Sequence, residues 1–275
     1  MWRNAETGAT SDLRKLEIAV EELEIEEKSL ARDGFGQVYK ARRSNEQVVV
    51  KVINVGDDEE RHKVMDEASL TIRLNHPNVV KLFGVARVKQ KKIGIVMELS
   101  ARGSLDKCIG KIYRVKLTEI ALGIIDGLEY VHSQKVIHRD IKSNNILIFG
   151  REDDMIPKIA DFGVSKVIQT EAMTHTRVGQ DLYMAPEVKM LYHYSFPADI
   201  FILAMTLFEM FNEQLILQSS AEVKDFIVAV HSGKVGDIPQ ICRVPEYLNG
   251  VVKRDWNEKP EKRPTLSEYF SALKG

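Results

Sequence analysis

The stretch His138–Leu147 reads HRDIKSNNIL and contributes most to deciding the fold class. Two further short runs follow it along the chain, DFG at Asp161–Gly163 and APE at Ala185–Glu187. Each three-residue run alone is a weak signal, because such triplets arise often by chance. These two runs together with His138–Leu147, in this order and at this spacing, form a specific pattern. Together they therefore indicate a defined fold family more strongly than any one of them does.

The chain before about Leu99 carries the patterns of strands and one helix. Leu13–Glu27 is rich in glutamate; its first half is typical of a solvated helix and its last part alternates like a strand. Residues 57–75 read as a helix that ends before Pro77, because the residue before proline avoids the helical conformation. Strand-like runs cover two parts of 36–54, and also 79–85 and 93–99.

The chain after Gly103 is mainly helical. Its apolar residues recur at helical intervals over 117–132, and helical stretches recur near 197–212, 221–231 and 263–273. We therefore predict an α+β fold of two lobes. The predicted parts are an N-terminal extension over 1–20, a small strand-rich lobe with one main helix over 21–100, and a larger helical lobe over 101–275.

Composition and charge exclude several classes of protein. The 275 residues are 44% hydrophobic and carry a formal net charge of −1, so charge gives no support for binding to nucleic acid or to a membrane surface. Ile200–Phe208 is too short to span a bilayer and is better interpreted as a buried core helix. We see no signal peptide, and Cys108 and Cys242 fit free thiols in a reducing compartment. We therefore expect a cytoplasmic protein with no nucleic-acid partner and no membrane segment.

The three runs resemble the catalytic loop, the magnesium-binding triplet and the close of the activation segment of eukaryotic protein kinases. The resemblance extends from about Leu23 to Leu273. It implies a bilobal enzyme that uses ATP and Mg2+ to phosphorylate protein substrates. Lys142, two residues after Asp140, is typical of the serine/threonine type. Residues 138–147 most resemble the tyrosine-kinase-like branch, which includes mitogen-activated kinase kinase kinases and receptor-interacting kinases.

The resemblance implies roles for individual residues. Asp140 orients or accepts the proton of the substrate hydroxyl, and Lys142 steadies the γ-phosphate. Asn145 and Asp161 bind magnesium. Lys51 lies in an apolar strand, where an ammonium is costly to bury without a partner, and the resemblance pairs it with Glu67 on the following helix. Asp199 is expected to anchor the central helix, and Arg263 to pair with Glu187.

The resemblance also implies a nucleotide site. Val38 and Leu147 sandwich the adenine, and Val49 lies over it. Met97 is the gatekeeper, and Glu98 and Leu99 form the hinge. The glycine-rich loop grips the phosphates together with Lys51. The expected nucleotide-contact residues are Ala31, Gly34, Gly36, Val38, Val49, Lys51, Met97, Glu98, Leu99 and Leu147.

The chain departs from the family pattern at several positions. Ala31 and Asp33 stand where the family has glycines, and a plain hairpin turn is an open alternative for Gly34 and Gly36. Val49 stands in place of alanine, Thr71 in place of a larger apolar residue and Gln180 in place of threonine. These departures keep a second hypothesis open, a pseudokinase that acts as a nucleotide-binding or scaffold module. A tyrosine or dual-specificity kinase is a third.

Arg139 directly precedes Asp140, and in the family this arrangement is typical of control by phosphorylation of the activation segment. The candidate acceptors are Thr170, Thr174 and Thr176, of which we favour the last two. An upstream activating kinase is therefore an expected partner. The sequence leaves the oligomeric state open.

Overall fold

The computed structural model of the chain describes residues 16–32, 36–162, 182–191, 194–233 and 245–274. It divides into two compact units. The N-terminal unit comprises Met1–His76, Val80–Leu99 and Asp161–Met173. The C-terminal unit comprises Pro77–Val79, Ser100–Ala160 and Thr174–Gly275.

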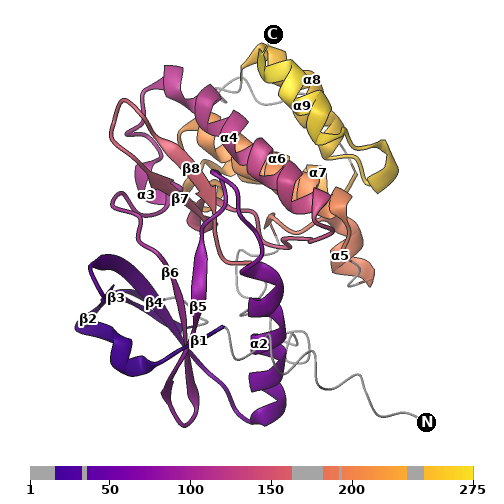
Figure 1. Cartoon of the computed structure of the whole chain (residues 1–275). Coiled ribbons are helices and arrows are strands. Elements are labelled where there is room, and N and C mark those ends of the chain that lie inside the picture. Colours follow the sequence, from indigo (N-terminus) through magenta and orange to yellow (C-terminus); the bar gives the residue numbers. More distant parts are fainter. Residues whose placement is uncertain (1–15, 33–35, 163–181, 192–193, 234–244, 275) are drawn as a thin grey trace. The chain divides into compact units, whose positions relative to one another are not determined.

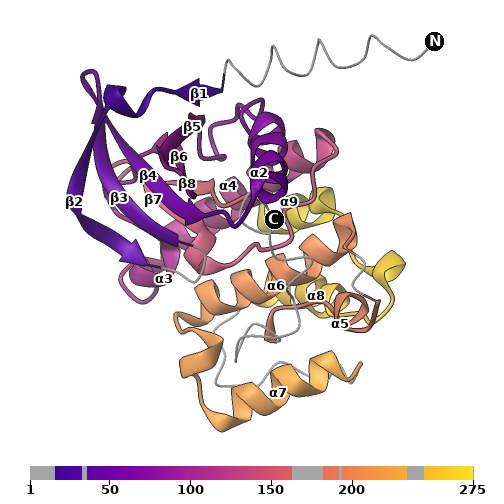
Figure 2. The same cartoon turned by 90° about the horizontal axis from the view of Figure 1, so that it is seen from below.

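The N-terminal unit contains a six-stranded sheet in the order β1-β5-β6-β4-β3-β2 (Figures 1 and 2). All neighbouring strands are antiparallel except β1 and β5, which are parallel. Runs of β-branched residues favour the central strands, and the turn between β3 and β4 has Ser44 at φ 54°. The strands are β1 (Glu17–Ile18), β2 (Leu23–Arg32), β3 (Gly36–Arg43), β4 (Glu46–Asn54), β5 (Leu82–Lys89) and β6 (Lys92–Glu98).

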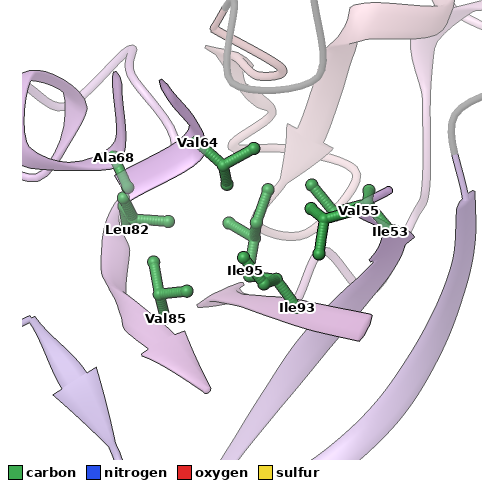
Figure 3. Packing of buried hydrophobic residues seen from close by; sticks show 8 residues of the cluster. All are labelled: Ile53, Val55, Val64, Ala68, Leu82, Val85, Ile93 and Ile95. Carbon is green, nitrogen blue, oxygen red and sulfur yellow. The ribbon is translucent and has the colours of Figure 1, made fainter. Parts of the chain in front are cut away.

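Helix α2 (Asp58–Thr71) packs on one face of this sheet. It begins at Asp57, whose side chain accepts a hydrogen bond from the backbone nitrogen of Glu60 at 2.9 Å and so caps the helix. Val64 and Ala68 are fully buried against the sheet (Figure 3). The predicted helix over 57–75 is therefore present, but it ends earlier than expected. The sheet residues of this cluster are Ile53, Leu82, Val85, Ile93 and Ile95, and Val55 joins them directly after the end of β4.

The other face of the sheet is covered by the chain just before β2. Ile18 of β1 and Leu23 are buried there, with the short 3-10 helix η1 (Val20–Glu22) between them. The prediction of a solvated helix in the first half of Leu13–Glu27 is thus wrong for its described part. Buried, regularly spaced apolar residues in this segment pair with and cover the sheet instead of facing water.

The C-terminal unit is built around α6 (Phe196–Asn212), in which every residue from Ala198 to Phe211 is buried. This confirms the interpretation of Ile200–Phe208 as a core helix. No helix in the described part of the chain is long and apolar enough to cross a membrane. The other helices are α3 (Leu105–Cys108), α4 (Arg114–Ser133), α5 (Pro186–Leu191), α7 (Ala221–His231), α8 (Glu246–Asp255) and α9 (Leu266–Lys274).

Short elements join these helices. The strands β7 (Ile146–Phe149) and β8 (Ile156–Ile159) form an antiparallel hairpin, and the 3-10 helices are η2 (Ser143–Asn145), η4 (Ile216–Gln218) and η5 (Pro260–Lys262). The helix predicted over 263–273 begins only at Leu266, because Pro264 disfavours a helical conformation at Arg263. Helix α8, which lies beside α9 (Figure 1), was not predicted.

Candidate active site

Lys51 is a buried cation in the centre of β4. Its side chain is 3% exposed, and its Nζ lies 2.7 Å from both Oδ1 and Oδ2 of Asp161. Both residues belong to the N-terminal unit. A buried ammonium needs an opposite charge at hydrogen-bond distance, and Asp161 supplies it with both oxygens. The structure therefore brings together two of the predicted site residues, which are 110 positions apart in the sequence.

The expected partner of Lys51 is Glu67, and that pair stays a prediction. Glu67 lies on α2, as expected, but its side chain is outside what the structure describes. Asp33, Gly34 and Gln180 also lie outside the described residues, as do the three candidate threonines of the activation segment.

The remaining nucleotide-contact candidates of the N-terminal unit lie on neighbouring strands. Ala31 pairs with Val38 across β2 and β3, and Val49 pairs with Met97 across β4 and β6. Glu98 ends β6, where its Oε1 accepts from the backbone nitrogen of Lys81 at 2.7 Å.

Leu99 follows β6 and is the last residue of this stretch of the N-terminal unit. Leu147, by contrast, lies on β7 in the C-terminal unit.

Gly36 has a reason within the fold to be glycine. A Cβ added at this position would lie 2.2 Å from the carbonyl oxygen of Val52 on the facing strand β4. Any side chain would therefore push β3 away from β4. This requirement for glycine does not depend on whether a phosphate binds nearby.

A small cavity of about 30 Å3 lies beside Asp161 and Met97. Thr71, the last residue of α2, and Phe162 also line it. The short side chain of Thr71 leaves space where a longer apolar side chain would fill it. Thr71, which stands where the family has a larger apolar residue, therefore lies beside a gap in the packing of the N-terminal unit.

Asp140, Lys142 and Asn145 form a compact group in the C-terminal unit. The Oδ2 atom of Asp140 lies 3.0 Å from Nζ of Lys142 and accepts a hydrogen bond from Nδ2 of Asn145 at 2.8 Å. The same Nδ2 donates to the backbone oxygen of Asp140 at 2.9 Å. Two side chains therefore hold the carboxylate through its Oδ2 atom, and the Asp140 side chain is 18% exposed.

The buried helix α6 holds the loop that carries this group. Asp199 is fully buried, and its carboxylate accepts from the backbone nitrogens of His138 at 2.8 Å and Arg139 at 2.7 Å. Thr206 donates its hydroxyl to the backbone oxygen of Ile141 at 3.0 Å. Arg139 has φ 71°, a conformation that non-glycine residues rarely adopt unless surrounding bonds impose it. The expected anchoring role of Asp199 is confirmed.

The two residues predicted to bind magnesium carry suitable donor atoms. Asn145 donates through Nδ2 to Asp140 and carries an amide oxygen as a further donor atom for a metal. Asp161 offers a carboxylate that it already shares with Lys51. Mg2+ takes one or two such oxygens and completes its shell with phosphate and water. Among the described residues, no cluster of three or more His, Cys, Asp or Glu could hold a metal alone. Each of the two residues therefore offers an oxygen of the kind that magnesium takes, and their binding of one common ion stays a prediction.

Residues 25–272 match the family described as protein kinase domain. The chain belongs to this family. The protein kinase fold predicted from the sequence, with a strand-rich N-terminal part and a helical C-terminal part, is confirmed.

Known relatives of the chain are named as protein kinases, several of them as serine/threonine kinases. The chain is 29% identical over 254 residues to "Serine/threonine/tyrosine-protein kinase HT1" of Arabidopsis thaliana, covering 88% of this chain and 64% of the relative. It is 37% identical over 248 residues to "Serine/threonine-protein kinase dst1" of Dictyostelium discoideum, covering 88% and 33%. It is 30% identical over 282 residues to a "Mitogen-activated protein kinase kinase kinase" of Drosophila melanogaster, covering 97% and 24%. The chain thus spans less than two thirds of the length of each of these relatives.

The kinase resemblance also predicted an ion pair that the structure contains. Nη1 and Nη2 of Arg263 each lie 2.7 Å from one carboxylate oxygen of Glu187. This two-pronged geometry is the strong form of an arginine–carboxylate pair. It ties the APE run to the segment between α8 and α9, and the expectation is confirmed.

Sequence reasoning missed Glu209, Tyr183 and Ser143, which share a set of buried hydrogen bonds in the C-terminal unit. One signal was available: Glu209 is an acidic residue within the apolar run of α6. A carboxylate in such a helix is either at its exposed end or bound by internal donors.

Proposed function

We propose that this protein kinase domain transfers the γ-phosphate of ATP to serine or threonine hydroxyls of protein substrates, with Mg2+ as cofactor. The observation that carries the proposal is the group of Asp140, Lys142 and Asn145, which buried bonds from α6 hold in place. Family membership and the names of the relatives support the same activity.

In the proposed reaction the acceptor oxygen forms a bond to the γ-phosphorus. The bond from that phosphorus to the bridging oxygen breaks, and its electron pair leaves with ADP. The proton of the acceptor hydroxyl passes to the carboxylate of Asp140. Lys142, whose ammonium lies beside that carboxylate, stabilises the negative charge of the transferred group.

The nucleotide would be held by residues of both units. Lys51 would contact the α- and β-phosphates while Glu67 supports it, and Asn145 and Asp161 would hold the magnesium ion. When bound, magnesium neutralises charge on the β- and γ-phosphates. Asp161 would then exchange part of its contact with Lys51 for the metal. The proposal requires Lys51 and Asp161 to act on the same triphosphate as Asp140.

Arg139 supports the proposal that an upstream kinase controls the enzyme. Its Nε atom is buried and has no hydrogen-bond partner among the described residues. Its guanidinium lies 5.7 Å from the ring centroid of Tyr194, which holds the side chain in place. A phosphate on Thr174 or Thr176 would supply an anion for this cation. A cytoplasmic location stays a prediction.

The proposal is tested by incubating the purified protein with labelled ATP, magnesium and a generic protein acceptor. We expect transfer by the parent and at least a hundredfold loss in Asp140→Asn, because the amide cannot accept the proton. The matched control is Asp126→Asn, the same change at an exposed position on α4, which should leave transfer unchanged. Phosphoamino-acid analysis of the product separates serine/threonine from tyrosine activity.

No transfer by the parent with magnesium or manganese, even after phosphorylation of its activation segment, would remove the proposed activity. A melting shift with Mg-ATP but without transfer would then favour the alternative, a pseudokinase that binds nucleotide.

A further inference from the structure

Ser100 is the first residue after the expected hinge, and it belongs to the C-terminal unit. Its hydroxyl donates a hydrogen bond to the backbone oxygen of Ile148 on β7 at 2.5 Å and accepts one from the backbone nitrogen of Gly103 at 3.0 Å. Ile148 is fully buried, and its backbone nitrogen donates to the backbone oxygen of Gly103 at 2.9 Å. These three hydrogen bonds join Ser100, Gly103 and Ile148 into one closed set.

The backbone turn at Gly103 makes this set possible. Gly103 has φ 75°, a conformation that glycine adopts without strain. The turn brings the N–H of Gly103 back to the hydroxyl that lies three residues earlier. Ser104 then forms a backbone bridge with Leu147 on β7. The loop over 100–104 is thus fixed to β7 at both ends, by a side chain at Ser100 and by the backbone at Ser104.

Two of the predicted adenine contacts adjoin these hydrogen bonds. Leu99 directly precedes Ser100, and Leu147 directly precedes Ile148. Successive residues of a strand face opposite ways, so the half-buried Leu147 lies on the other face of β7 from the buried Ile148. The hydroxyl of Ser100 therefore ties the chain that leaves Leu99 to the strand that carries Leu147.

We infer that Ser100 is a positioning residue for the nucleotide base, because its hydroxyl fixes the end of the hinge relative to Leu147. The inference rests on the proposed use of ATP and deepens it, since it assigns a determinant of adenine affinity. The hinge at Leu99 would meet the edge of the base, and Leu147 would meet its face. Ser100 acts through these two residues and does not itself touch the nucleotide.

The affinity for a flat base is sensitive to such positions. Apolar atoms attract each other best at about 3.5–4.0 Å, and a gap of about 0.5–1 Å forfeits roughly a quarter to a half of that attraction. The phosphates, by contrast, would be bound by Lys51 and magnesium, whose attraction falls off slowly with distance. Loss of the Ser100 hydroxyl should therefore weaken binding of the base and leave binding of the phosphates unchanged. A serine that only stabilises its own loop would not separate the two.

The first experiment titrates Ser100→Ala with adenosine and, separately, with magnesium and inorganic tripolyphosphate, and follows the melting shift. We expect the Kd for adenosine to rise about fivefold, as the loss of one ordinary hydrogen bond implies. The Kd for tripolyphosphate should stay the same. Ser100→Thr keeps the hydroxyl and should bind adenosine within about twofold of the parent. An unchanged Kd for adenosine in Ser100→Ala, or an equal rise for both ligands, overturns the inference.

The matched control is Arg102→Ala in the same loop. Nε of Arg102 donates to the backbone oxygen of Gly150 at 3.2 Å, so it ties this loop to the β7–β8 hairpin beyond the end of β7. Its removal should leave the Kd for adenosine unchanged. A rise equal to that in Ser100→Ala would assign the effect to the loop as a whole and overturn the role of Ser100.

The second experiment measures amide hydrogen exchange without nucleotide. The amides of Gly103 and Ile148 should exchange at least tenfold faster in Ser100→Ala, and at the parent's rate in Arg102→Ala. Unchanged protection of both amides overturns the inference, as does a parent that binds no adenosine. A parent that binds adenosine but transfers no phosphate overturns only the proposed function.

Discussion

Nζ of Lys51 lies at the same distance, 2.7 Å, from both carboxylate oxygens of Asp161. The two partners are unequally buried: the lysine side chain is 3% exposed and the aspartate side chain 24%. Losing one partner therefore has different consequences from losing the other. Asp161 can be solvated when the ammonium is removed, whereas the ammonium is held in the interior of the sheet when Asp161 is removed.

The first prediction follows from this asymmetry. Lys51→Met should change the unfolding free energy by less than about 1 kcal/mol, because an apolar chain replaces a buried charge. Asp161→Ala should lower it by about 2 kcal/mol, because the ammonium loses this carboxylate. Both should abolish the melting shift with Mg-ATP. Urea unfolding measures the stabilities, with Lys28→Met on the exposed surface of β2 as control. Equal losses from both changes would contradict the asymmetry.

The second prediction concerns the cavity beside Thr71. An enclosed cavity of about 30 Å3 costs about 24 cal/mol per Å3, or about 0.7 kcal/mol, and this value is an upper bound here because the pocket is partly open to solvent. Thr71→Ile should recover most of this free energy by filling the space. Thr71→Val is the matched control, since it removes the same hydroxyl and keeps the β-branch but adds no further methylene. Denaturant unfolding should rank isoleucine above valine, and the reverse order would mean that the site cannot accept more volume.

The sequence predicted most of the architecture because its signals are local. The largely apolar run in α6 and the break at His76-Pro77 each depend on neighbouring residues alone. Helix α8 also had a local signal, Leu248, Val251 and Val252 at helical spacing, but it is short and lies between charged residues. The packing of residues 16–23 on the sheet had no local signal in the sequence, because it depends on which strand lies free at the edge of the sheet.

The candidate site was predictable only through the family resemblance. Residue types alone identified Lys51 as a cation that needs a partner, but no local rule selects Asp161, which is 110 residues away. The bonds of Glu209 were equally hidden, since Ser143 and Tyr183 are common residue types at positions that are distant in the sequence. Tertiary contacts between remote segments therefore account for what the sequence left undetermined.

The third prediction concerns Asp255, which is fully buried at the end of α8. Neither carboxylate oxygen has a hydrogen-bond partner among the described residues. Burial raises the pKa of Asp255 well above its ordinary value; Arg263 and Arg254 oppose this shift, and Glu268 adds to it. The folded state therefore holds a proton at pH values where the unfolded chain releases it. The contribution of Asp255 to the unfolding free energy is fully present at pH values below its pKa in the unfolded chain. This contribution is lost as the pH rises through the raised pKa of the folded state.

Asp255→Asn should remove this fall, because the amide does not ionise. Its advantage in unfolding free energy over the parent should thus grow between pH 4 and pH 8, as measured by urea titrations. The control is Glu268→Gln on α9, where a hydrogen bond from the backbone of Thr265 lowers the pKa and Arg254 adds to the effect. Glu268→Gln should lower the unfolding free energy at pH values above the pKa that Glu268 has in the unfolded chain, and should leave it unchanged at lower pH. A constant difference between Asp255→Asn and the parent would show that Asp255 ionises normally.

The fourth prediction tests whether the segment before residue 25, where the family match begins, is part of the folded domain. Ile18 is 5% exposed and belongs to the cluster on the face of the sheet opposite α2, whereas its neighbour Glu17 is exposed to solvent. The backbone of Leu16 approaches β5 so closely that a Cβ on Gly84 would lie 2.5 Å from its oxygen. Ile18→Ala should therefore lower the unfolding free energy by about 2 kcal/mol. Glu17→Ala on the same strand should change it by less than about 0.5 kcal/mol. Equal effects of the two changes in denaturant unfolding would mean that β1 does not cover the sheet in solution.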